Sequence, residues 1–150
     1  MKTYRDDING YEFQYPESFG ANVWGAHFWP PKVTVVSINE NPVKNGCPEL
    51  PLELESTVIN NIKLNNIEYT EYIVREPAAG NLYNDYCYVT QKQKKYYVLN
   101  FIIREVNGCA GGSPGAFWET EFEEECINLD RVKDIENPIK TMVSTFKFID

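Results

Sequence analysis

Four cysteines, spread widely along the chain, limit what this sequence can fold into more than any other feature. They are Cys47, Cys87, Cys109 and Cys126, and no two of them form a Cys-x-x-Cys pair. The only histidine, His27, is far from all four in sequence. Structural zinc sites and thioredoxin-like redox sites use closely spaced residues, so neither is predicted. An even number of widely spaced cysteines indicates two structural disulfides, and therefore an oxidising compartment.

Four cysteines allow three disulfide connectivities, of which we expect Cys109–Cys126 together with Cys47–Cys87. Cys109 lies in a glycine-rich loop after a predicted strand, and Cys126 lies on the helix predicted to follow that loop. A bridge between them would close a loop of roughly 16 residues and stabilise the fold by about 3 kcal/mol. Four free, buried thiols are the alternative.

The length and the charge of the chain disfavour several classes of function. Its 150 residues fit a single domain, 1–150, that can bury a core of its own. The formal net charge of -8 repels nucleic acids and anionic membrane surfaces. Lys92, Lys94 and Lys95 form the most basic stretch, and the interleaved glutamines are typical of a solvated hairpin tip. We therefore predict no nucleic-acid partner.

The sequence contains no run of about 20 apolar residues, which is the length that spans a bilayer. Residues 1–7 also lack the apolar stretch of a signal peptide. Read literally, this start indicates a cytoplasmic protein, although a mature sequence whose signal had been removed would look the same. The cysteines favour the second interpretation. We expect an extracytoplasmic protein, either secreted or at the cell envelope, with a lipid anchor upstream as one option.

Alternation of apolar and polar residues predicts a chain built mainly of strands. The expected strands are 10–16, 33–38, 57–64, 67–75, 82–90 and 96–106, and the stretch 44–52 is predicted to be loop. Asn65-Asn66 offers turn chemistry that tolerates positive φ. In the strand 96–106 apolar residues occupy both faces, which is typical of a central strand covered on both sides.

Helical periodicity appears only in the last third of the sequence. Large or sulfur-containing side chains recur at helical spacing at Trp118, Phe122, Cys126 and Leu129, with glutamates between them. A second helix is predicted to start at Asn137-Pro138, an N-cap followed by proline. Its apolar face would comprise Ile139, Met142, Val143 and Phe146. Residues 146–149 either end that helix or add an edge strand. The predicted fold class is therefore α+β, an antiparallel β-sheet flanked by helices.

The two ends of the chain resemble a known family. The opening segment NGYEFQYPESF, residues 9–19, resembles the start of PsbP-like domains and of related bacterial lipoproteins, and residues 142–148, MVSTFKF, resemble their ending. The resemblance implies an α/β/α sandwich and an extracytoplasmic, secreted or lipid-tethered, non-catalytic domain. The cysteine-bearing loop 108–115 departs from the photosynthetic members, so their role in oxygen evolution is not carried over.

Few residues offer catalytic chemistry. His27 is a natural general base, but no Gly-x-Ser-x-Gly nucleophile elbow accompanies it. The loop 108–115 joins a strand to a helix as phosphate-binding loops do, yet it lacks their Lys-Ser/Thr. Glu121, Glu124 and Glu125 fit a solvated helix face and lack EF-hand spacing. We predict no catalytic residue, no metal and no cofactor.

The strongest candidate contact surface is aromatic. Trp24, His27, Phe28 and Trp29 lie in a predicted loop, where large rings either cap the core or dock a partner. We therefore expect a non-enzymatic binding or accessory domain whose partner is a protein, a peptide or a glycan. Two alternatives remain. One is a small-substrate hydrolase that uses paired carboxylates, and the other is an inhibitor that presents the loop 108–115 to a target enzyme.

Overall fold

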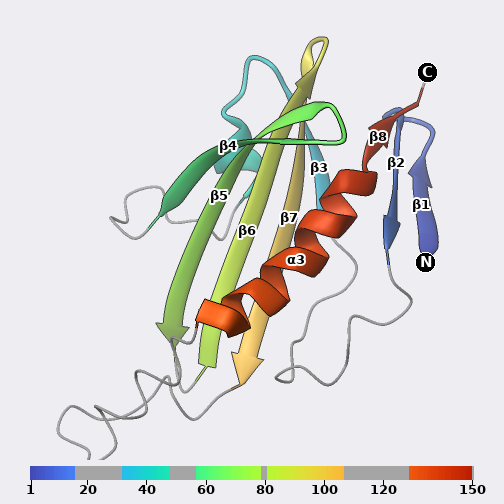
Figure 1. The fold of residues 1–150 in the computed structure, drawn as a ribbon. Helices are drawn as coiled ribbons and strands as arrows, with labels where there is room; N and C mark the ends of the chain where they lie inside the picture. The colour runs from blue at the N-terminus through green and yellow to red at the C-terminus, as the bar shows by residue number, and fades with distance from the viewer. Residues whose placement is uncertain (16–31, 48–56, 79–80, 107–128, 150) are drawn as a thin grey trace, which may run out of the picture.

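The computed structural model describes residues 1–15, 32–47, 57–78, 81–106 and 129–149, which form two antiparallel sheets and two helices (Figure 1). The strands are β1 (Lys2–Asp6), β2 (Tyr11–Tyr15), β3 (Lys32–Ser37), β4 (Val58–Leu64), β5 (Ile67–Ala78), β6 (Asn81–Lys92), β7 (Lys95–Val106) and β8 (Lys147–Phe148). The helices are α1 (Pro42–Gly46) and α3 (Leu129–Thr145). The predicted α+β class, with antiparallel sheets and mostly strand, is confirmed.

The larger sheet has five strands in the order β3-β7-β6-β5-β4. Strands β4 to β7 follow one another as a meander, and β3 joins it beside β7. The β4–β5 hairpin turns at Asn65 and Asn66, whose φ angles of 48° and 63° are left-handed values that asparagine tolerates well. The β6–β7 hairpin turns at Gln93, with a φ of 55°. Both predicted turns are thus confirmed.

The smaller sheet joins segments from the two ends of the chain in the order β1-β2-β8. β2 pairs with β8 through Tyr11 and Phe148. The backbone N–H of Gln14 also donates a 2.8 Å hydrogen bond to Oγ1 of Thr145, at the end of α3. The strand β2 was predicted, and the option of an edge strand within 146–149 is the one that occurs. The sequence did not predict β1, because its exposed side chains lack an apolar alternation.

Each face of the five-stranded sheet carries its own hydrophobic cluster. On one face, α3 crosses the strands (Figure 1) and buries Ile139 and Val143 in the same cluster as Leu99 of β7. On the other face, Val43 of α1 belongs to a second cluster with Val98, also of β7. The adjacent residues of β7 therefore point into different cores, which confirms the predicted central strand covered on both sides.

The start of α3 corrects a prediction. The Asn137-Pro138 pair was expected to begin the helix, but α3 starts at Leu129 and contains Pro138 in its interior. An interior proline removes one helical hydrogen bond and costs about 3 kcal/mol. The three residues Ile139, Met142 and Val143, all buried, offset this cost by packing against the sheet. Tertiary packing outweighs the local signal for a helix start.

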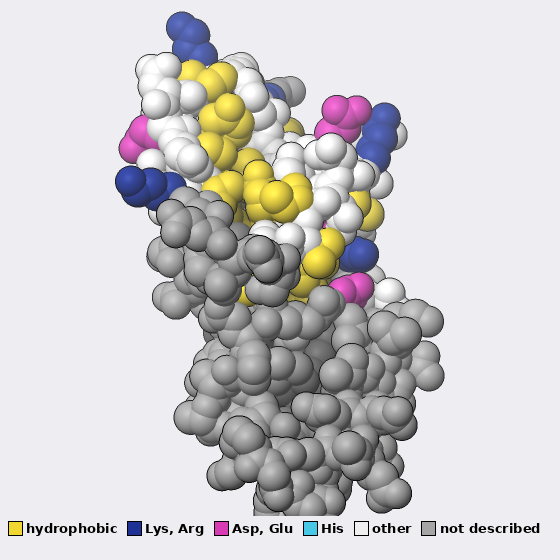
Figure 2. Space-filling model, turned by 90° about the vertical axis from the view of Figure 1, so that its left-hand side faces the viewer, with side chains coloured by type: hydrophobic (Ala, Val, Ile, Leu, Met, Phe, Trp, Pro, Cys, Tyr) yellow, Lys and Arg dark blue, Asp and Glu magenta, His cyan; other side chains and the backbone are white. Residues whose placement is uncertain are grey.

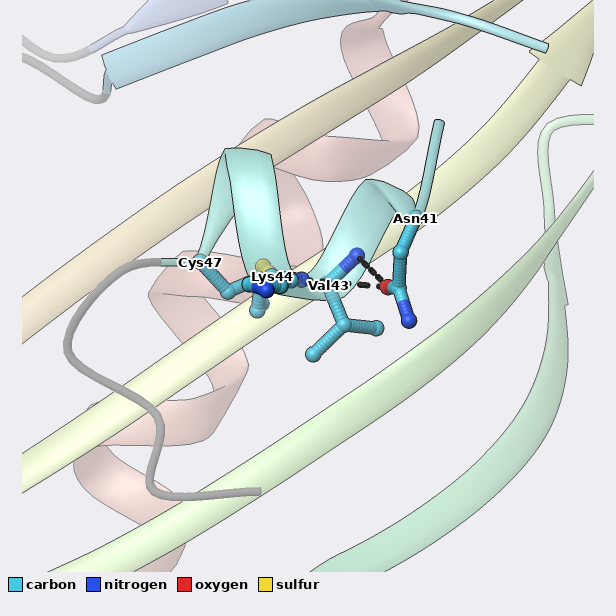
Figure 3. The surroundings of a disulfide bond; sticks show 5 residues. Asn41, Val43, Lys44 and Cys47 are labelled. Carbon is cyan, nitrogen blue, oxygen red and sulfur yellow. Dashed lines mark hydrogen bonds between the residues drawn. A yellow bond between two sulfur atoms is a disulfide. The ribbon is translucent and has the colours of Figure 1, made fainter. Parts of the chain in front are cut away.

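A second correction concerns the segment that precedes the first cysteine. Residues from Lys44 were predicted to be loop, yet Pro42–Gly46 form α1. Oδ1 of Asn41 caps this helix by accepting hydrogen bonds from the backbone N–H groups of Val43, at 3.0 Å, and Lys44, at 3.1 Å (Figure 3). The prediction failed because an N-cap asparagine before proline is a helix signal that was read only as a strand stop.

A disulfide joins α1 to the centre of the sheet. Cys47, the C-cap residue of α1, is bonded to Cys87 of β6, with 6.2 Å between their Cα atoms. Both residues are buried, and they belong to the cluster on the α1 face of the sheet. The predicted Cys47–Cys87 bridge is therefore confirmed. Cys109 and Cys126 lie outside the described residues, as do residues 118–128 of the expected earlier helix, whereas its last residue, Leu129, begins α3.

Candidate functional site

The aromatic contact surface expected at Trp24, His27, Phe28 and Trp29 falls outside the described residues. The same holds for the loop 108–115 and for the glutamates at 121, 124 and 125. Those expectations stay predictions. The candidate site is therefore built from the two sheets, their hairpins and α3.

The five-stranded sheet forks at the end that carries its hairpin turns. Pairing between β5 and β6 stops at Thr70↔Val89. Pairing between β4 and β5 continues three residues further, to Leu64↔Ile67, and pairing between β6 and β7 continues three residues further, to Lys92↔Lys95. Beyond Thr70 the two hairpins therefore separate. Figure 1 shows the β4–β5 hairpin bending across the sheet while the β6–β7 hairpin continues straight.

A groove of about 1040 Å³ lies in this fork, and we call it the hairpin groove. Its walls come from β4, β5, β6 and the start of β7, with Phe148 of β8 at one side. Ile67 and Tyr69 belong to the cluster on the α3 face of the sheet, whereas Val89 and Tyr96 belong to the cluster on the α1 face. Side chains from both faces line one groove because it passes through the plane of the sheet where the strands part.

The lining of the hairpin groove combines uncharged polar, apolar and charged side chains. Amides and hydroxyls come from Asn61, Asn66, Thr70, Thr90 and Gln91. Such groups orient a ligand through hydrogen bonds, while the neighbouring aromatic rings supply flat apolar contact. The groove thus has the composition of a binding site for a polar, extended ligand.

Lysines give the hairpin groove a local charge opposite to that of the whole protein. Lys63 and Lys92 line it, and Glu68 is its one carboxylate. Lys63 and Glu68 are directly opposite each other in the β4–β5 hairpin, so their charges largely offset each other. Nζ of Lys92 lies 4.9 Å from the centre of the Phe148 ring, which is cation–π distance. The neighbouring turn adds Lys94, so this end is basic on an acidic protein.

A second polar cluster lies under α3. Glu71 of β5 is 1% exposed, and its Oε2 accepts a 3.0 Å hydrogen bond from Nδ2 of Asn60. Nζ of Lys140 lies 3.7 Å from Oε1 of Glu71 and 3.9 Å from Oε2 of Glu136. Burial raises the pKa of Tyr88, and the nearby Glu71 carboxylate raises it further. The cluster therefore pairs two carboxylates through one lysine.

The surroundings of Glu71 fit a structural role better than a catalytic one. Substrate would have to reach a carboxylate that is sealed between the sheet and α3. Lys140 is 37% exposed and covers Glu71 from the solvent side. A catalytic carboxylate must come within hydrogen-bond distance of its substrate, directly or through one water molecule. The arrangement instead attaches α3 to β4 and β5.

Apolar side chains gather on the face that carries β4. Val58 and Ile59 of this edge strand are 45% and 60% exposed. Figure 2 looks onto this side of the molecule and shows hydrophobic side chains in the upper half of the face, bordered by charged ones. An exposed apolar edge strand favours association with another chain, but neither Val58 nor Ile59 lines the hairpin groove.

The described residues contain neither a cluster of metal-ligand side chains nor a helix that could cross a membrane. Within these ranges, no three His, Cys, Asp or Glu side chains come together as metal ligands do. In the same part of the chain, neither helix has the length and apolar character that crossing a membrane requires.

Comparisons with known proteins give no relative for this chain. No family model, no curated protein and no solved structure matches it. Residues 9–15 and 142–148, near the two ends of the sequence, lie side by side, because β2 pairs with β8 and the backbone of Gln14 bonds to Thr145. Their contact gives both segments a shared structural reason for their sequence pattern.

Sequence reasoning did not find the hairpin groove. It treated Asn65-Asn66 as a turn and the lysines after Gln91 as a solvated tip, and both statements are correct locally. The groove arises because two neighbouring hairpins differ in curvature, which no periodicity within either hairpin reveals. The one available signal was the presence of polar residues, such as Thr70 and Thr90, on or at the end of predicted strands.

Proposed function

We propose that this protein is a non-enzymatic, extracytoplasmic binding or accessory domain whose ligand occupies the hairpin groove. The observation that carries the proposal is the groove itself, in which amide, hydroxyl and aromatic side chains from four strands converge on one opening. A ligand site is usually lined by apolar walls together with a small number of polar groups that converge on the ligand. The aromatic segment at residues 24–29 is part of the same proposal as a further contact surface.

The proposed location rests on the Cys47–Cys87 bridge. Disulfides are rare in cytosolic proteins, where thiols are kept reduced, and common in proteins of oxidising compartments. The bridge is compatible with an extracytoplasmic location. A second bridge, Cys109–Cys126, and a PsbP-like kinship belong to the same proposal. A protein secreted through or anchored at the cell envelope would use both bridges as covalent bracing.

The non-enzymatic part of the proposal rests on the titratable groups. The hairpin groove contains one carboxylate, Glu68. Of the two carboxylates that Lys140 joins, Glu71 is buried and Glu136 lies on α3, and neither lines the groove. A hydrolase that works with two carboxylates needs both beside its substrate. The groove supports binding more readily than this chemistry.

A screen of two ligand classes tests the binding function. Immobilised protein is probed with a glycan array and with a random heptapeptide display library. The variant Asn61→Trp fills the groove from β4, and Ile59→Trp is its matched control. Ile59 lies on the same face of the same strand, two residues away, and it does not line the groove.

Ligands should bind the wild type and Ile59→Trp equally and should bind Asn61→Trp at least about tenfold more weakly, which is a change of about 1.4 kcal/mol. A screen in which no ligand of either class distinguishes Asn61→Trp from the wild type contradicts the proposed function.

The location is tested separately by alkylating the protein in its native cells, with and without reductant, and counting blocked cysteines by mass spectrometry.

A further inference from the structure

The geometry points to an extended peptide as the ligand of the hairpin groove, held as an additional strand between the two hairpins by hydrogen bonds to both. This inference rests on the proposed binding function and names the class of its ligand. It is carried by the fork in the β5–β6 ladder, a feature of the backbone that a small polar ligand would not require.

The fork leaves two facing strand edges without a strand between them. Continuing the β5–β6 register past Thr70↔Val89 would bring residues 67–69 of β5 beside residues 90–92 of β6, and among the described residues this pairing is not made. Residues 67–69 pair only with β4, and residues 90–92 only with β7. A strand that has one neighbour directs alternate N–H and C=O groups to its open side. Both walls of the groove therefore offer backbone donors and acceptors.

Peptide recognition by strand addition uses such edges. The main-chain hydrogen bonds supply affinity, and alternate side chains of the peptide enter pockets on the two faces of the sheet. Side chains from both faces line the hairpin groove, with Tyr69 from the α3 side and Tyr96 from the α1 side. A strand rises about 3.3 Å per residue, so the three residues on each wall match a short peptide segment.

The charges around the groove favour a peptide that is neutral or acidic. Among the lining residues two lysines, Lys63 and Lys92, face one carboxylate, Glu68, and the adjoining turn carries the lysines at 94 and 95. The rest of the protein carries the excess negative charge, so a basic peptide would be attracted elsewhere on the surface. An acidic segment would be steered to the forked end of the sheet.

A backbone-modified peptide tests the inference. The heptapeptide enriched most strongly in the display screen is synthesised unmodified and in two analogues, one N-methylated at its odd residues and one at its even residues. N-methylation removes backbone donors and leaves the side chains in place. Because alternate residues of a strand bond to opposite neighbours, a peptide held by both hairpins should lose about tenfold or more in affinity in each analogue.

Charge reversal provides a second readout. Lys63→Glu unbalances the pair with Glu68 and should weaken an acidic peptide roughly threefold to tenfold, since rim charges contribute modestly. Lys44→Glu is the control, because Lys44 is an exposed residue of α1 that does not line the groove. It makes the same change in net charge and should leave the affinity for the peptide unchanged. Amide resonances of residues 67–69 and 90–92 should shift on binding.

Three outcomes overturn the inference. In the first, either N-methylated analogue binds as tightly as the unmodified peptide. In the second, the peptide binds Asn61→Trp as well as it binds the wild type. In the third, the screen yields glycans that need the groove but no peptide, and then the binding function stands while the strand-addition inference falls. If neither class of probe needs the groove, both proposals fall together.

Discussion

The hydroxyl of Tyr97 donates a 2.9 Å hydrogen bond to the backbone carbonyl of Asn9, and this bond ties the five-stranded sheet to the β1–β2 turn of the smaller sheet. Tyr97 is buried, and the two residues are 88 positions apart in sequence. The turn is further ordered by Asp6, whose carboxylate accepts hydrogen bonds from the backbone and side chain of Asn9. The hydrogen bond between Tyr97 and Asn9 therefore helps to hold the smaller sheet against the larger one.

Removing this hydroxyl should destabilise the protein without changing its fold. We expect Tyr97→Phe to lower the free energy of unfolding by about 1 kcal/mol, because the Asn9 carbonyl loses its donor in a part-buried position. Urea unfolding measures the change. Tyr96→Phe is the control, since the Tyr96 hydroxyl makes no hydrogen bond to another described residue. Equal effects of the two substitutions would contradict the assigned role.

The pair of Glu71 and Lys140 should show strong coupling. Lys140→Met leaves a buried carboxylate without its cation, and we expect it to cost about 1–3 kcal/mol of unfolding free energy. Adding Glu71→Gln removes the uncompensated charge and keeps an acceptor for Asn60, so the double variant should recover part of this loss. A double-mutant cycle in urea checks this. Strictly additive losses would show that the two side chains do not interact.

Gly46 permits the close approach of α1 to β7. A Cβ atom at this position would lie 2.6 Å from Cγ2 of Val98, well inside contact distance. We therefore predict that Gly46→Ala destabilises the protein by about 1–3 kcal/mol through overpacking. Combining it with Val98→Ala should restore part of the stability, even though Val98→Ala alone is also unfavourable. Thermal unfolding of the three variants provides the comparison.

The Cys47–Cys87 bridge should make a large contribution to stability. Its two residues are 40 positions apart, and the chain-entropy model assigns a loop of that size about 4 kcal/mol. We expect Cys47→Ala/Cys87→Ala to lower the free energy of unfolding by up to that amount, measured by denaturant titration. In the native wild type, the buried bridge should resist a reductant that opens it quickly once the protein is unfolded. Rapid reduction of the native protein would contradict its burial.

Alkaline pH should unfold the protein through its buried tyrosines. Burial raises the pKa of Tyr69 and Tyr88 above the ordinary value of 10.0. Unfolded tyrosines ionise above that pH while these two stay protonated, so the stability they contribute is full below pH 10 and is lost above it. The loss is up to about 1.4 kcal/mol per pH unit for each tyrosine. Urea titrations from about pH 9 to about pH 11 measure it.

A tyrosine-to-phenylalanine comparison isolates this effect. Tyr88→Phe removes one ionisable group and should make the decline in stability above pH 10 shallower, whatever its effect at neutral pH. Absorbance of tyrosinate should rise in step with unfolding. If Tyr69 and Tyr88 of the wild type ionise while the protein is still folded, burial does not raise their pKa values as expected.

Much of the fold could be predicted because its strands are encoded by local alternation. The β4-to-β7 meander, the Asn65-Asn66 turn and the double-sided burial of β7 all follow from patterns within about a dozen residues. The Cys47–Cys87 pairing was predictable as one of three choices. The helix start at Asn137 was predicted wrongly because a local cap signal competes with packing along the whole of α3.

The candidate site could not be predicted in the same way. Thr70 and Val89 mark the point where the β5–β6 ladder ends, and nothing in either residue indicates that end. It depends on how strongly the β4–β5 hairpin bends toward α3, which is a property of tertiary packing. Sequence patterns locate side chains on strands, but a groove between two hairpins depends on the path that each backbone takes.

The pairing of β2 with β8 has a consequence for how the chain acquires its structure. A nascent chain that has delivered β2 must wait for more than a hundred further residues before Tyr11 meets Phe148. Contacts of such sequence separation form late and slowly. All five strands of the larger sheet are therefore synthesised before the smaller sheet can close, and until then β2 keeps one edge without its partner strand.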